Sequence, residues 1–133
     1  MRRAVIVLCG CLAGCVRPPQ SNVVPLSAEG AAVLAYDITA FTEAHSNRRQ
    51  PISVVLAEGD TTLWPVVAND LHTARYNITS GAPVQLRYSV STLAEGTFLR
   101  VSLGSVSAAR LYHEEPNAQL APSGPFTVIE AAE

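Results

Sequence analysis

Two stretches in the second half of the chain alternate between residues typical of a core and residues typical of a surface. The first places apolar side chains at every second position, at Val84, Leu86, Tyr88 and Val90. The second does the same with Leu99, Val101 and Leu103. A period of two with one apolar face predicts half-buried antiparallel strands. Residues 94–96 suit a hairpin turn between them, so we expect a β-meander here.

Two further patterns predict helices in the first half. Ser27 is a suitable N-cap, and Glu29 lies in the first turn, where the helix dipole favours an acidic residue. One face of residues 27–45 is apolar at helical spacing, with Ala31, Leu34, Ala35, Ile38 and Phe41. The opposite side is expected to hold most of the polar residues, including Asp37, Thr42 and Glu43.

The second helix is expected to begin at Thr61 or Thr62, because Pro65 is tolerated in a first helical turn. Its apolar face would contain Leu63, Val66, Val67 and Leu71. Trp64, the single tryptophan, admits two interpretations. It is either a packing residue in or beside the core, which is the commoner case, or an anchor for a partner protein.

Short runs rich in β-branched and aromatic residues predict the remaining strands, at residues 52–57, 75–79, 106–112 and 126–129. Residues 114–124 are polar and contain proline, and we expect them to form a loop. The predicted order is therefore helix, strand, helix, strand and a strand meander. This order predicts a small α+β domain in which two helices pack on one face of a mixed sheet.

The N-terminus has the organisation of a secretory signal. Arg2-Arg3 precede an apolar run from Ala4 to Leu12, and Leu12-Ala13-Gly14-Cys15 resembles the lipobox of bacterial lipoproteins. The alternative is a short buried helix of a cytosolic protein, but the prolines in residues 16–20 could not continue such a helix. We therefore expect residues 1–14 to be a signal peptide and Cys15 to carry acyl chains that hold the protein on a membrane.

The lipobox defines the expected domain organisation. Residues 15–26 would be a lipidated, extended and solvated linker, and residues 27–133 a periplasmic domain. Valine rather than aspartate follows Cys15, which by resemblance to enterobacterial lipoproteins indicates the outer membrane. The linker is either passive or bound by a partner as an extended peptide. A partner would grip its apolar part, Val23, Val24, Pro25 and Leu26.

Composition and spacing point away from several function classes. Cys9, Cys11 and Cys15 are the only cysteines, so the expected domain has no thiol for a disulfide. The formal net charge is −2, without the basic patch of a nucleic-acid groove. His45, His72 and His113 lack neighbouring ligands at metal spacing, and no serine has a partner that would activate it. We expect no catalytic residue, no cofactor and no metal.

The last third of the chain resembles TrbH, a family of lipoproteins of the Trb conjugation apparatus. The matching segments are residues 86–88, 99–103, 108–112 and 121–126. The resemblance implies a structural, non-enzymatic component of a type IV secretion machine, in the outer-membrane core complex. It also implies a homo-oligomeric ring with larger secretion subunits as partners. Some members of this wider class carry a domain similar to the N-zero domain of secretins, and the predicted element order is compatible with it.

Two other functions are compatible with a small α+β lipoprotein. One is a pilotin, or assembly chaperone, that acts transiently on an outer-membrane pore. The other is a periplasmic ligand-binding or inhibitor module, which would need a clear pocket. A scaffold should purify with the pore in fixed ratio, whereas a chaperone should not. A ligand-binding module should tolerate scrambling of the linker.

Overall fold

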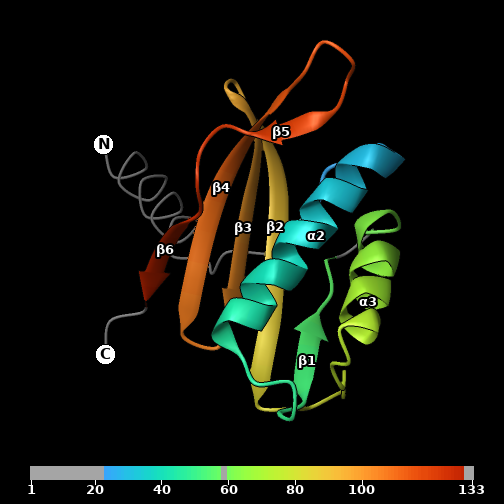
Figure 1. The fold of residues 1–133 in the computed structure, drawn as a ribbon, viewed down its shortest axis with the longest axis vertical. Helices are drawn as coiled ribbons and strands as arrows, with labels where there is room; N and C mark the ends of the chain where they lie inside the picture. The colour runs from blue at the N-terminus through green and yellow to red at the C-terminus, as the bar shows by residue number, and fades with distance from the viewer. Residues whose placement is uncertain (1–22, 58–59, 131–133) are drawn as a thin grey trace, which may run out of the picture.

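The computed structural model describes residues 23–57 and 60–130 and places two helices on one face of a mixed β-sheet (Figure 1). The helices are α2 (Ala28–His45) and α3 (Leu63–Thr73). The strands are β1 (Ile52–Val55), β2 (Val84–Leu93), β3 (Gly96–Leu103), β4 (Val106–Glu114), β5 (Leu120–Pro122) and β6 (Thr127–Glu130). The predicted α+β class is thereby confirmed. The predicted signal peptide and Cys15 lie outside the described residues.

The sheet follows the order β1-β2-β3-β4-β5, and β6 pairs with β4 beside β5. Only β1 and β2 are parallel, and every other pair is antiparallel. The predicted hairpin is present, with Leu86 opposite Leu103 and Val90 opposite Leu99. These leucines and Val90 are fully or almost fully buried, because the alternating apolar face lies under the helices.

Helix α2 supplies much of the core. Ala31, Leu34, Ala35 and Ile38 are completely buried, and its neighbour α3 buries Leu63, Val67 and Leu71. At the start of α2, the Ser27 Oγ accepts a hydrogen bond from the Gly30 backbone N–H at 3.0 Å. This is the predicted N-cap. At the start of α3, the Asp60 carboxylate accepts the Leu63 N–H at 2.9 Å.

Ser27→Ala is expected to lower the free energy of unfolding by about 1 kcal/mol, because the Gly30 N–H loses its acceptor. Ser27→Gly is the matched control and should cost only a few tenths of a kcal/mol, since glycine is itself tolerated at an N-cap. Urea unfolding of the two variants beside the unsubstituted protein measures the difference. Equal stability of Ser27→Ala and the unsubstituted protein would contradict the assigned cap.

The strand predicted at residues 75–79 is wrong. Arg75 has a left-handed backbone with φ of 72°, and its N–H bonds back to the His72 carbonyl at 2.9 Å. The next residue, Tyr76, donates its N–H to Leu71 and closes the end of α3. The segment therefore ends a helix instead of starting a strand. Within it, Ile78 makes only one isolated bridge, to Ile52.

Two smaller predictions also fail. The loop predicted at residues 114–124 contains β5, in which Leu120 lies opposite Glu114 and Pro122 opposite Tyr112. Three residues that end in a proline carry too little pattern to predict a strand. Thr42, expected on the polar side of α2, is completely buried. Its hydroxyl donates to the Ile38 carbonyl at 2.8 Å, so its polar group is satisfied within the helix.

Candidate interaction surface

The predicted partner-binding segment packs partly against its own domain. Val23 forms a parallel bridge with Val90, and the Val24 N–H donates to the Val90 carbonyl at 3.1 Å. The side chains of Val23, Val24 and Leu26 are half-buried against the core, while Pro25 is exposed. The segment fits here because β1 pairs with β2 only as far as Arg87. These residues are not the solvated spacer that the sequence indicates, and contact with a partner stays a prediction.

Trp64 lies at the rim of the core. It is half-buried on α3 and packs against the core cluster. It also lines an open hollow of about 300 Å³ beside β1, together with Val54, Leu56 and Ile78. Gln85 lines the same hollow, whereas Val23 meets β2 at Val90. Five strand residues span roughly 17 Å, so the hollow and the bridge of Val23 lie at different positions along β2.

The outer edge of β1 is only partly paired. The Ile52 N–H donates to Asn77 at 3.0 Å, and the Ile52 carbonyl accepts from Thr79 at 2.8 Å. Alternate residues of a strand direct their backbone groups to the same edge, so the N–H and carbonyl of Val54 point the same way as those of Ile52. In residues 23–57 and 60–130, no further backbone group bonds to Val54 at this edge. Such an edge can pair with another chain.

Apolar side chains border this open edge. Leu56 is 51% exposed and Ile78 is 37% exposed, and both line the same open hollow as Trp64. An unpaired strand edge combined with an apolar hollow is what an added β-strand binds: the backbone supplies hydrogen bonds and the hollow accepts a side chain. The sequence reasoning identified Trp64 but missed Leu56 and Ile78, because exposure at a sheet edge depends on the strand order.

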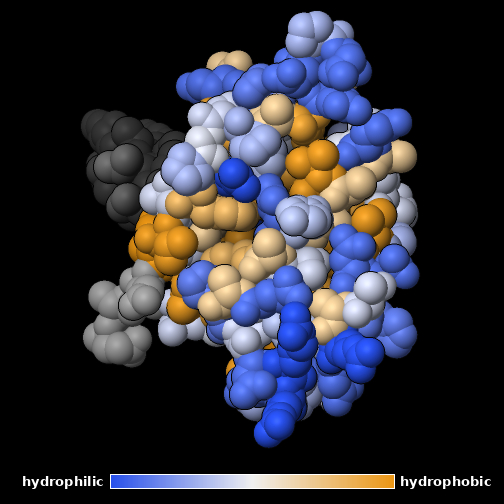
Figure 2. Space-filling model, viewed as in Figure 1, coloured by the Kyte–Doolittle hydropathy of each residue, from blue (hydrophilic) through white to orange (hydrophobic). Residues whose placement is uncertain are grey.

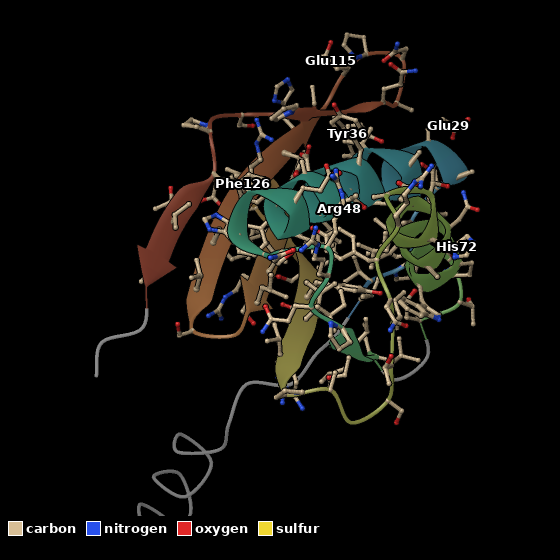
Figure 3. All side chains as sticks on the ribbon, turned by 60° about the horizontal axis from the view of Figure 1, so that its bottom comes forward. Glu29, Tyr36, Arg48, His72, Glu115 and Phe126 are labelled. Atoms are coloured by element: carbon tan, nitrogen blue, oxygen red, sulfur yellow. The ribbon has the colours of Figure 1, made fainter. Side chains whose placement is uncertain are left out.

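A second polar feature joins α2 to the sheet and was also missed. The Asp37 carboxylate accepts a hydrogen bond from the Arg110 guanidinium at 3.0 Å and another from the Tyr112 hydroxyl. Arg110 also donates its Nε–H to the Gly124 carbonyl at 2.8 Å. Its guanidinium lies 5.1 Å from the centre of the Phe126 ring, and Phe126 lies beside α2 in Figure 3. This cluster ties α2, β4 and the segment before β6 together.

The electrostatics of the cluster favour this structural role. Burial, and then the hydrogen bond and charge of Asp37, raise the pKa of Tyr112 far above its ordinary value. Tyr112 therefore stays protonated and remains a donor to Asp37. The side chains of Arg110 and Asp37 are 21% and 13% exposed, so their ion pair is screened less than a surface pair. The cluster holds the domain together and leaves its charges already paired.

Two searches of the described chain bear on other site classes. Within residues 23–57 and 60–130, no group of three or more histidine, cysteine or acidic side chains could hold a metal ion. None of the helices in the same residues is long and apolar enough to cross a membrane.

Comparison with known proteins identifies the family to which the chain belongs. No curated protein and no solved structure matches it, so the likeness to a secretin N-zero domain stays a prediction. A family model described as conjugal transfer protein TrbH matches residues 19–132. The match includes every helix and strand described above, from α2 to β6. The resemblance noted in the last third of the sequence is confirmed, and the chain belongs to the TrbH family of conjugal transfer proteins.

Proposed function

We propose that this protein is a structural lipoprotein of the conjugation apparatus. In this proposal, acyl chains on Cys15 anchor it in the outer membrane, with its domain in the periplasm. It scaffolds the pore as a homo-oligomeric ring, in contact with larger subunits of a type IV secretion system. The observation that carries the proposal is the lipobox-like Leu12-Ala13-Gly14-Cys15 immediately before a domain of the TrbH family.

The length of the tether supports the proposal. Val23, where the described chain already pairs with β2, comes eight positions after Cys15. A fully extended chain of that length spans at most about 28 Å. A lipid on Cys15 would therefore hold the domain close to the membrane surface. This short reach suits a fixed part of a membrane complex.

Cys15→Ser tests the anchor. We expect the substituted protein to leave the membrane fraction and DNA transfer to fall to the level of donor cells that lack the gene, because no acyl chain can be attached. Cys11→Ser is the matched control: it removes a cysteine of the same segment outside the lipobox and should preserve transfer. Mating frequency, membrane fractionation and the mass of the N-terminal peptide are measured together. Unchanged transfer by a Cys15→Ser protein would refute the proposal.

A further inference from the structure

Exposed hydrophobic residues gather at the two edges of the sheet. Six large hydrophobic side chains are exposed in the described chain, and four of them lie at these edges. Leu56 and Ile78 border β1, whereas Val128 and Ile129, 47% and 59% exposed, belong to β6. Figure 2 shows hydrophobic residues at the side of the molecule where β6 lies. Because the four residues divide between two different edges, each edge offers its own apolar strip.

Short strand length is the main protection of these two strips. Natural sheets guard their edges with very short strands, charged residues, prolines or bulges. Both strands have only four residues, but β1, Ile-Ser-Val-Val, contains no charged residue and no proline, and β6, Thr-Val-Ile-Glu, has one charged residue at its end. In residues 23–57 and 60–130, no backbone group outside the sheet bonds to either Val54 or Val128. Apolar edges with so few charges can pair with another chain.

The directions of the two edge strands are compatible with each other. β1 runs parallel to β2, β3 runs opposite to β2, β4 opposite to β3 and β6 opposite to β4. It follows that β1 and β6 run in opposite directions within one sheet. If a second copy continues the sheet with its helices on the same side, its β6 lies antiparallel to β1. Antiparallel pairing allows short strands to bond through straight hydrogen bonds.

The side chains of the two edge strands can also be assigned to the same side of the sheet. Val128 lies opposite Ala108, whose side chain is buried under the helices, so Val128 is on the helix side of the sheet. Ile129 is opposite Ser107, on the uncovered side. On β1, Val54 pairs with the buried Leu86, so Val54 is also on the helix side, whereas Ser53 and Gln85, which line the same hollow, are on the uncovered side. In a continued sheet, Val128 therefore lies on the same side as Val54, at the helix-side part of the hollow of about 300 Å³.

We propose that β6 of one copy pairs antiparallel with β1 of the next copy and seats Val128 in the hollow formed by Trp64, Leu56 and Ile78. The two surfaces are different, so the contact is heterologous and joins copies head to tail into a closed ring or an open array. The inference deepens the proposed scaffold function, on which it rests, by identifying the contact between copies. The occupant of the β1 edge is a second copy of this chain.

Cysteine cross-linking tests the contact, because the chain has no cysteine after Cys15. The full-length chain carrying Leu56→Cys and Val128→Cys is expressed in donor cells with the complete conjugation apparatus, then oxidised. Residues directly opposite across antiparallel strands have Cβ atoms about 4.5–5.5 Å apart, close to the geometry of a disulfide. We expect a ladder of dimers, trimers and larger species on a non-reducing gel. Val54→Cys with Val128→Cys covers a register shifted by two residues.

The control pair is Leu56→Cys with Ile129→Cys, which lies on opposite sides of the continued sheet and should lose the ladder. Each single variant should stay monomeric, and a mixture of the two singles should stop at dimers, since the contact is heterologous. The proposal is overturned if neither pair with Val128→Cys forms a ladder at normal protein level. Dimers of a single variant would also overturn it, because they indicate a contact between identical surfaces.

This experiment and the anchor experiment fail separately. A missing ladder combined with loss of transfer by Cys15→Ser would remove the strand pairing and leave the scaffold proposal standing. A ladder combined with normal transfer by Cys15→Ser would establish the contact between copies and remove the lipid anchor. Mating frequency is therefore recorded for every variant, and the membrane fraction is probed for protein level.

Discussion

Asp37→Ala is expected to lower the free energy of unfolding by about 2–4 kcal/mol, one of the largest losses from a single polar side chain in this domain. The substitution removes the acceptor of two hydrogen bonds, from Arg110 and Tyr112. It also leaves the Arg110 guanidinium, whose side chain is only 21% exposed, without its counter-charge. A partly buried charge that loses its partner costs more than the pair itself contributes. Urea unfolding of the domain measures the effect.

Glu43→Ala is the matched control for this prediction. Glu43 is also an acidic residue of α2 in an ion pair, with Arg48 at 2.7 Å, but those two side chains are 39% and 58% exposed. Exposed pairs contribute about 0–1 kcal/mol, so this variant should unfold close to the unsubstituted protein. If Asp37→Ala and Glu43→Ala destabilise the domain equally, the Asp37 cluster does not hold α2 to the sheet.

Gly96→Ala is expected to cost at least about 3 kcal/mol, because the backbone strain and the steric overlap act together. Gly96 starts β3 with φ of 146°, a conformation that residues with a side chain rarely adopt. A Cβ atom at this position would lie 2.0 Å from the Tyr112 carbonyl oxygen of β4. The backbone of β3 would have to move away from β4, which disturbs the pairing of Thr97 with Tyr112. Thermal unfolding followed by circular dichroism measures the loss.

Gly104→Ala separates strain from steric overlap. Gly104 also has a positive φ, 61°, but a Cβ atom there would meet no other atom within 4 Å. Only the left-handed conformation is then penalised, by about 1–2 kcal/mol. We therefore expect Gly96→Ala to unfold at a clearly lower temperature than Gly104→Ala. The reverse order would show that β3 and β4 do not approach at Gly96 as described.

The long meander was predictable because its signal is local. The alternation around Val84–Val90 and Leu99–Leu103 determines which side chains face the helices, and a slip of one residue would expose the whole apolar set. The structure pairs Leu86 with Leu103 in agreement with that pattern. Helix α2 was predictable for a similar reason, since its N-cap and its apolar face lie within one short segment.

The failures have non-local causes. The residues around Ile78 have strand-forming side chains, but the left-handed Arg75 and the hydrogen bonds back to α3 determine their conformation. Strand β5 forms because Leu120 and Pro122 pair with the end of β4, and the local sequence of residues 120–122 does not reveal this contact. The helical pattern of α2 predicts Asp37 on its polar side. It does not reveal the cluster, because the partners of Asp37, Arg110 and Tyr112, come more than seventy residues later.

The candidate surfaces also combine features that the local sequence predicts with features that depend on the topology. The sequence identified Trp64 and the apolar segment of residues 23–26, and both border β2 or β1 in the structure. It could not identify the open edges, because an edge is defined only when the strand order is known. The placement of Val128 on the helix side likewise depends on its pairing with Ala108. Residue patterns thus locate candidate contacts, and topology determines which of them remain available to another chain.

The scaffold proposal is tested most directly by purifying the protein with its partners. A tag at Glu133 allows the membrane complex to be captured from donor cells in mild detergent and then sized. The proposal predicts a large particle that contains other conjugation subunits in a fixed ratio to this lipoprotein. A variable ratio would favour a pilotin-like assembly role, and a lone lipoprotein of monomer size would contradict the proposal.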